Sequence, residues 1–318
     1  MSKRILTYIF LVAAAVTASC TKNVIDLPSG GSISFAPVAE KSTKAIIEGT
    51  SYPTTESFVV SAYHEGSDAY FEDLEASYNN SIALWETSTA EYWPLAGSLD
   101  FIAYSPSSAS GVTIDSDGVS ATDYTIQTSA QMTTDLCYAE ATVADCSNHP
   151  ESVPLVFNHA LSQVVFRVKA ADYYENTTLS MTSLSIGGIY SVGDFSEGAW
   201  ENQDTEYSYT LSSTSTALTY SETTPVAADV CSYLFIPQEF GLNAALRVGY
   251  SITQNVSGNN YTLTNPPVSI PLGSSLAAWE PGKKYIYTIN IGMNNVITFT
   301  ASTVGWQDEN DNIIVEEN

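Results

Sequence analysis

The stretch YSITQNVSGNNYTL, residues 250–263, holds two alternating segments joined by a glycine-containing turn. Apolar and polar side chains alternate in each segment, as they do along a strand that buries one face. The residues between them, Ser257-Gly258-Asn259-Asn260, are typical of a turn between antiparallel strands. We therefore expect a β-hairpin here.

Short alternating segments of the same kind recur along the chain and are separated by turn residues. A second hairpin is expected where Val112-Thr113-Ile114 turns through Asp117-Gly118 toward Val119. Further strands are expected at residues 57–63, 100–104 and 164–168. Sustained helical periodicity with caps is lacking, although a short helical turn is indicated near Glu72 to Tyr78. The pattern predicts an all-β protein made of sandwiches.

The composition limits the classes of function. The chain has 318 residues, of which 44% are hydrophobic, so disorder is excluded as the main description. Ten Lys and Arg against 35 Asp and Glu give a formal net charge of -25. Such a charge opposes binding to nucleic acid or to an anionic membrane surface. With 20 tyrosines and only 14% charged residues, the composition is typical of extracellular β-proteins.

The N-terminus has the pattern of a secretory signal peptide over residues 1–19. Lys3 and Arg4 precede an apolar run from Ile5 to Val16, which is too short for a membrane span of about 20 residues. Cys20 then follows small residues, as in a bacterial lipobox, although Thr17 replaces the usual Leu, Val or Ile. We expect Cys20 to be acylated and the mature protein to lie outside the inner membrane as a lipoprotein. The alternative is an ordinary cleaved signal with an incidental cysteine.

The remaining cysteines suggest no metal site. Cys137 and Cys146 are close enough in sequence to form a disulfide, and an exported protein permits one; three free thiols, counting Cys231, are the open alternative. There is no CxxC motif, and the three histidines lack zinc-ligand spacing. Asp308, Asn310 and Asn312 begin like a calcium loop, but the required glycine is replaced. We expect neither metal nor cofactor.

Motifs of common enzymes are also missing, so we expect no enzyme. The sequence has no G-x-S-x-G, no H-E-x-x-H and no Gly-rich phosphate loop. His159 lies near Ser162, but their position at a strand start favours a structural hydrogen bond.

Two strand-rich halves are separated by a polar stretch with a proline, Ser147-Asn148-His149-Pro150. We place an N-terminal β-sandwich at residues 45–150 and a C-terminal β-sandwich at residues 151–318.

Basic residues are distributed unevenly. After Lys41 and Lys44 no Lys or Arg occurs before Arg167, so a trypsin-like protease would meet few sites. Just upstream, residues 32–36 (SISFA) alternate like a strand. Residues 20–44 therefore suggest a lipidated tether with a removable strand, followed by a cleavable linker. A plain tether is the alternative.

Several segments, in their order along nearly the whole chain, resemble the fimbrillin family, the type V pilins that Bacteroidales export as lipoproteins. The segments are residues 92–94, 99–106, 157–162, 234–238, 279–289, 297–301 and 305–306. Within them, Trp93, Trp279 and Trp306 are also expected to be core packing residues.

The resemblance implies two transthyretin-like β-sandwich domains in tandem and a route of assembly that starts from an outer-membrane lipoprotein. A trypsin-like protease would cut after Lys44 or Lys41 and release the strand from Ile33 to Val38, which includes Phe35. The vacated groove would accept the C-terminal strand of another pilin subunit in a homo- or hetero-polymer, a form of β-augmentation. The donor strand here would contain Ile313, Ile314 and Val315. The resulting fimbria would support adhesion at the cell surface, and the stalk, tip and anchor positions all stay open.

The alternative function is that of a monomeric glycan-binding lipoprotein on the outer surface. Its candidate residues are Tyr173, Tyr174 and Tyr190, whose rings would stack on sugar faces. A glycan binder would keep its N-terminus, whereas a pilin would lose it and polymerise.

Overall fold

The computed structural model describes residues 31–39, 52–171, 174–218, 227–293 and 297–306. Over these ranges the chain forms β-strands and three short 3-10 helices, so the all-β prediction is confirmed. No helix within them is long and apolar enough to cross a membrane. The signal peptide, Cys20, Lys41, Lys44 and the expected donor strand fall outside the described residues.

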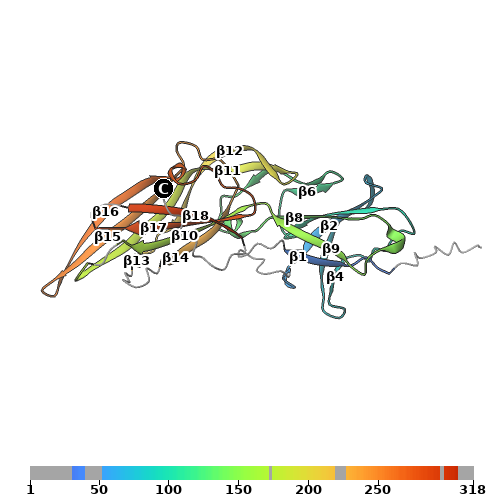
Figure 1. Ribbon diagram of the computed structural model, residues 1–318, viewed down its shortest axis with the longest axis horizontal. Helices are drawn as coiled ribbons and strands as arrows, with labels where there is room; N and C mark the ends of the chain where they lie inside the picture. The colour runs from blue at the N-terminus through green and yellow to red at the C-terminus, as the bar shows by residue number, and fades with distance from the viewer. Residues whose placement is uncertain (1–30, 40–51, 172–173, 219–226, 294–296, 307–318) are drawn as a thin grey trace, which may run out of the picture.

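The described chain forms two lobes along one long axis (Figure 1). The first lobe is a closed barrel with the strand order β1-β4-β3-β2-β5-β8-β9. Its strands are β1 (Phe35–Ala39), β2 (Phe58–His64), β3 (Asp68–Asn79), β4 (Leu84–Thr87), β5 (Leu99–Ser105), β8 (Cys137–Val143) and β9 (Val153–His159). The barrel differs from the open sandwich expected, because β1 pairs with both β4 and β9 and so joins the two edges.

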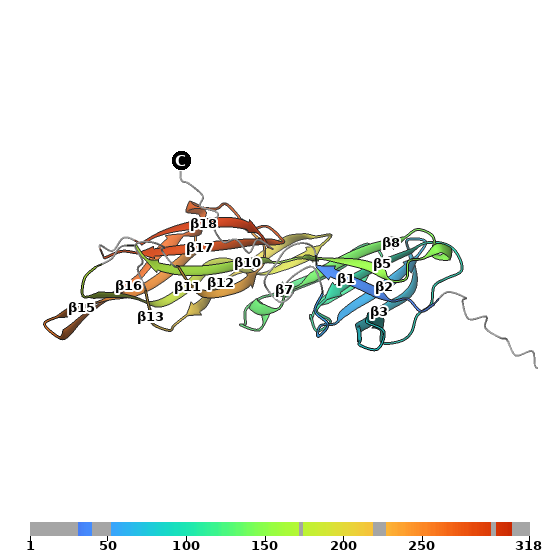
Figure 2. The same ribbon diagram turned by 60° about the horizontal axis from the view of Figure 1, so that its bottom comes forward.

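The second lobe contains two sheets (Figure 2). One has the order β14-β10-β17-β18 and the other the order β16-β15-β11-β7-β6. Both β12 and β13 also pair with β11. The strands are β6 (Val112–Asp115), β7 (Gly118–Thr125), β10 (Ser162–Ala170), β11 (Thr177–Ser196), β12 (Ala199–Ser212), β13 (Thr216–Ala217), β14 (Ala228–Phe235), β15 (Ala245–Val256), β16 (Asn259–Pro271), β17 (Lys283–Ile291) and β18 (Ile297–Gly305). The 3-10 helices are η1 (Gln131–Thr133), η2 (Cys146–Asn148) and η3 (Leu272–Ser274).

Both predicted hairpins are confirmed. β15 pairs antiparallel with β16, and the two turn residues Ser257 and Gly258 have φ of 51° and 86°. Positive φ at both central positions is the turn geometry that follows the twist of paired strands. β6 pairs with β7 through the second hairpin.

The helical turn indicated near Glu72 to Tyr78 is wrong, because this segment belongs to strand β3. Asp73 has a φ of 52°, and the pairing of β2 with β3 shifts register between Val60 and Ala62. The Asp73 backbone N–H is bonded to Ser61 Oγ at 2.9 Å. A β-bulge thus interrupts the alternation at the place where the sequence suggested a helix.

The sheets divide the chain at other places than residue 150. The stretch 147–150 lies between β8 and β9, which are both barrel strands. β6 and β7 come earlier in the sequence, yet β7 pairs with β11 in the second lobe. Chain order alone therefore does not separate the lobes.

Two large apolar clusters form the core. One lies inside the barrel and includes Phe35, Phe58 and Phe101; the other fills the second lobe and extends to the junction between the lobes. Trp93, Trp279 and Trp306 are each at most 2% exposed, so their expected packing role is confirmed.

Candidate functional site

The strand expected to be removable occupies a slot between β4 and β9. β1 pairs in parallel with β9 over five positions, from Phe35 opposite Val153 to Ala39 opposite Phe157. On its other side a single antiparallel pair joins Phe35 to Trp85 of β4. The strand is therefore held mainly through β9.

The side chains of this segment complete the barrel core. Ile33 is 2% exposed and Phe35 is fully buried. The Phe35 ring makes edge contacts with Phe58 and Phe101, both at a centroid distance of 5.7 Å. Burying such a side chain contributes about 1.5–3 kcal/mol. Loss of the segment would leave an apolar cavity between two unpaired strand edges.

Backbone hydrogen bonds fix the start of the segment. Ile33 N–H donates to Glu91 O at 2.7 Å, and Val153 N–H donates to Ser34 O at 2.8 Å. The Ser34 hydroxyl donates to Glu151 O at 3.1 Å. Most of these contacts use the backbone, so any extended peptide with apolar side chains at alternate positions would satisfy them.

The disulfide considered between Cys137 and Cys146 is absent from the structure, where both are free buried thiols and Cys231 is a free, half-buried one. Cys137 begins β8, and Cys146 lies beyond its far end. A seven-residue strand spans about 20 Å, whereas bridged cysteines have Cα atoms about 4.4–6.8 Å apart. The strand between them keeps the thiols apart.

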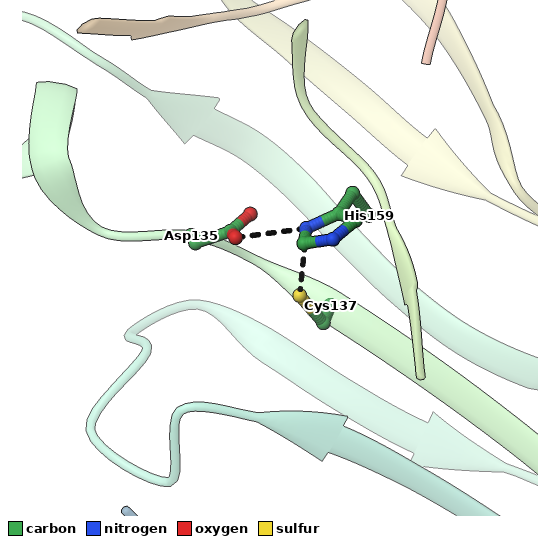
Figure 3. Close-up of side chains that lie close together, drawn as sticks. All are labelled: Asp135, Cys137 and His159. Carbon is green, nitrogen blue, oxygen red and sulfur yellow. Dashed lines mark hydrogen bonds and ion pairs between the residues drawn. The ribbon is translucent and has the colours of Figure 1, made fainter. Parts of the chain in front are cut away.

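His159 is placed away from Ser162. Its Nδ1 lies 2.8 Å from Asp135 Oδ2 and 3.4 Å from Cys137 Sγ (Figure 3). Ser162 Oγ instead donates to the backbone oxygen of Glu280 at 2.7 Å. The hydrogen-bonding role expected for both side chains is therefore present, but with different partners.

The cluster of Asp135, Cys137 and His159 does not have the geometry of a nucleophilic triad. In such a triad the acid and the nucleophile contact different nitrogens of the histidine ring. Here both contact Nδ1, and all three residues are buried. Sequence reasoning missed Asp135. The available signal was its spacing of two residues from Cys137, the residue at which β8 begins.

A separate cleft of about 710 Å³ opens on the second lobe. Its lining includes Tyr190, Trp200, Phe240, Glu201 and Glu239. The candidate sugar-stacking residue Tyr190 thus borders a cleft together with three further aromatic residues, Trp200, Phe240 and Trp279. Tyr174 is half-buried outside this lining, and Tyr173 falls outside the described residues.

Comparison with known proteins gives a family and a fold. The model of the fimbrillin-like family matches residues 43–306. A fimbrial protein from Bacteroides vulgatus has a similar structure, with a TM-score of 0.58 and 18% identity over 86% of this chain and 99% of that one. A candidate cell adhesion protein from Bacteroides uniformis gives a TM-score of 0.52 and 15% identity over 88% and 100% of the two chains. None of the curated proteins compared matches this chain. At these identities the solved structures show a shared fold alone.

Proposed function

The chain belongs to the fimbrillin-like family, and we propose that it is a structural subunit of a surface fimbria that assembles by donor-strand exchange. The observation that carries this proposal is the position of β1 in the barrel. This short strand completes the barrel core and is paired mainly with one neighbour, β9. Family membership implies a surface-exposed location and a structural, adhesive role rather than catalysis.

The proposed maturation has three steps. Acylated Cys20 carries the precursor to the outer membrane, where a trypsin-like protease cuts after Lys41 or Lys44. β1 then leaves its slot between β4 and β9. The C-terminal segment of another subunit, with Ile313, Ile314 and Val315 as its apolar side chains, takes its place. We also propose that the two lobes are transthyretin-like domains.

Before cleavage, β1 would prevent premature assembly. It covers the edges of β4 and β9, which would otherwise be open to pairing with another chain. The net charge of -25 adds repulsion between subunits until a specific groove opens.

The test is a Lys41→Gln/Lys44→Gln double variant expressed in a fimbriated Bacteroides host. The wild-type chain should begin at Ser42 or Ala45 in high-mass polymers that dissociate on heating. The double variant should stay monomeric and keep its acylated N-terminus, as measured by intact mass and terminal sequencing.

A Lys283→Gln variant is the matched control, because Lys283 is exposed and lies more than 200 residues after the linker in the sequence. It should assemble as the wild type does. Polymers built from uncleaved double variant would contradict the proposed route, and a wild-type chain found only as an acylated monomer would contradict the stalk role.

The cleft with Tyr190, Trp200 and Phe240 favours a second candidate function, the binding of a neutral glycan. Aromatic rings beside carboxylates offer stacking faces and hydrogen-bond acceptors for sugar hydroxyls. Glycan-array binding that is lost in Tyr190→Ala and kept in Tyr261→Ala would support it, since Tyr261 is exposed outside the cleft. Equal binding by both variants would contradict it.

A further inference from the structure

The cluster of Asp135, Cys137 and His159 brings three different donor atoms together at the junction of the two lobes. Cys137 and His159 are register partners in the pairing of β8 with β9, and Asp135 precedes Cys137 by two residues. Their sulfur, nitrogen and oxygen donors all lie within 4.8 Å of one another (Figure 3). Two strands and the segment that precedes β8 therefore meet at one point.

The distances suit a tetrahedral cation. Zn²⁺ binds sulfur at about 2.3 Å and nitrogen or oxygen at about 2.0–2.2 Å, so neighbouring donors lie about 3.3–3.6 Å apart. The Sγ–Nδ1 distance of 3.4 Å falls in this range. The Nδ1–Oδ2 distance of 2.8 Å would have to open by about half an ångström, which a carboxylate rotation supplies.

The contacts converge on a single ring nitrogen. Nδ1 of His159 carries either one proton or one lone pair, yet both Asp135 and Cys137 are directed at it. In addition, Asp135 Oδ1 is buried without a hydrogen-bond partner among the described residues. A cation placed between the three side chains would be bound by all of them. The Asp135 carboxylate would then bind it through both Oδ1 and Oδ2, which gives four donor atoms in total.

The charges balance at this site. An aspartate, a thiolate and a neutral imidazole together carry two negative charges, which one divalent cation neutralises. Neutrality matters because the His159 and Asp135 side chains are only 1% and 2% exposed. His159 Nδ1 forms an ion pair with Asp135 Oδ2 at 2.8 Å when the ring is protonated, so the neutral ring leaves the carboxylate charge to a cation.

The ring of Trp306 covers the cluster. It stacks on His159 with centroids 4.0 Å apart and planes 8° from parallel, and it is fully buried. The stack holds the imidazole plane fixed and keeps water away, both of which favour a tight structural site. Trp306 follows β18 of the second lobe, whereas His159 ends β9 of the barrel. Their ring stack therefore connects the two lobes at the cluster.

We propose that Asp135, Cys137 and His159 bind one Zn²⁺ ion, which fixes the junction between the barrel and the second lobe. Binding displaces the thiol proton of Cys137 and any proton on Nδ1 of His159, and both are released to solvent. The cation therefore binds more weakly as the pH falls.

The experiment uses the full exported chain, stripped with a chelator and then titrated with Co²⁺ as a spectroscopic probe for the zinc site. We expect one equivalent to bind, with a near-ultraviolet thiolate-to-cobalt band and the visible bands of a tetrahedral ion. Zn²⁺ should displace Co²⁺ and raise the Tm by several degrees.

Two variants and one control decide the assignment. Cys137→Ser and Asp135→Asn should lose the thiolate band or weaken binding at least tenfold, while Cys146→Ser should bind as the wild type does. Cys146 is the matched control, since it is also a buried thiol of the barrel lobe. The melting of each variant without metal shows whether it folds.

Absence of a thiolate band and of a Tm shift in the wild type would overturn the proposal and leave a metal-free ion pair beside a thiol. A band or Tm shift that persists in Cys137→Ser would also overturn it, because the ion would then lie elsewhere on this acidic chain.

Discussion

β1 and β10 are both paired in parallel with a neighbouring strand, but they differ greatly in the number of paired positions on their other side. β1 has five parallel pairs with β9 and one antiparallel pair with β4. β10 has eight parallel pairs with β17 and seven antiparallel pairs with β14. Each contributes a fully buried phenylalanine, Phe35 and Phe166. Burial therefore does not distinguish β1, the strand proposed to be replaced, from β10, whereas pairing on the second side does.

The largest expected effect is the loss of β1 itself. A chain lacking residues 1–44 loses the buried side chains of Ile33 and Phe35, so its barrel should lose about 3–6 kcal/mol of stability. Hydrogen exchange should show β4 and β9 unprotected and β10 unchanged. A synthetic peptide of residues 31–39 should restore protection. Unchanged exchange in β9 after truncation would show that β1 is not part of the barrel in solution.

Replacing one phenylalanine in each strand sharpens the comparison. Phe35→Ala and Phe166→Ala should each cost about 3–5 kcal/mol, because each removes a fully buried ring. The consequences should differ: Phe35→Ala frees β1 while the second lobe stays folded, and Phe166→Ala unfolds the second lobe. Denaturant unfolding followed by hydrogen exchange measures both. The same pattern of exposure in both variants would break the distinction.

A smaller effect is expected at alkaline pH. Burial raises the pKa of Tyr124 to about 12, with Asp135 and Cys137 adding to the rise. The folded state keeps this proton above pH 10, while the unfolded state loses it. Stability is therefore complete below pH 10 and falls as the pH rises toward 12, by about 1.4 kcal/mol per pH unit for such a group.

Urea unfolding of the wild type and of Tyr124→Phe at pH 8 and pH 11 checks this expectation. From pH 8 to pH 11 the free energy of unfolding should fall more for the wild type than for Tyr124→Phe. A constant difference would mean that Tyr124 ionises equally in both states.

The smallest effect is expected at an exposed ion pair between β10 and β14. Arg167 Nε donates to Asp229 Oδ1 at 2.6 Å across the β10–β14 pair, but the Asp229 side chain is 64% exposed. Water and salt screen such a pair, so Asp229→Asn should cost about 0–1 kcal/mol. Unfolding in low and high salt measures it. A loss above about 2 kcal/mol would mean that the register of β14 depends on this pair.

The sequence allowed the hairpins to be predicted because their information is local. A turn such as Ser257-Gly258 lies between the strands that it joins, and alternation identifies the buried face. The inward positions of Ile33 and Phe35 also follow from alternation.

The pairing partners could not be predicted in the same way. β1 lies beside β9, more than a hundred residues away in sequence, and no turn joins them. The attachment of β7 to β11 is likewise non-local. The site at Asp135 was missed for the same reason, because His159 comes close to it only through the pairing of β8 with β9.

The direct passage from β9 into β10 has a mechanical consequence. Only Ala160 and Leu161 separate the two strands, so a pull on the barrel reaches the second lobe along one continuous backbone. A peptide lying parallel to β9 would be loaded in shear, and its hydrogen bonds would have to break together rather than one after another. A fibre built on such joints would resist flow-induced tension far better than the small number of pairs in each joint suggests.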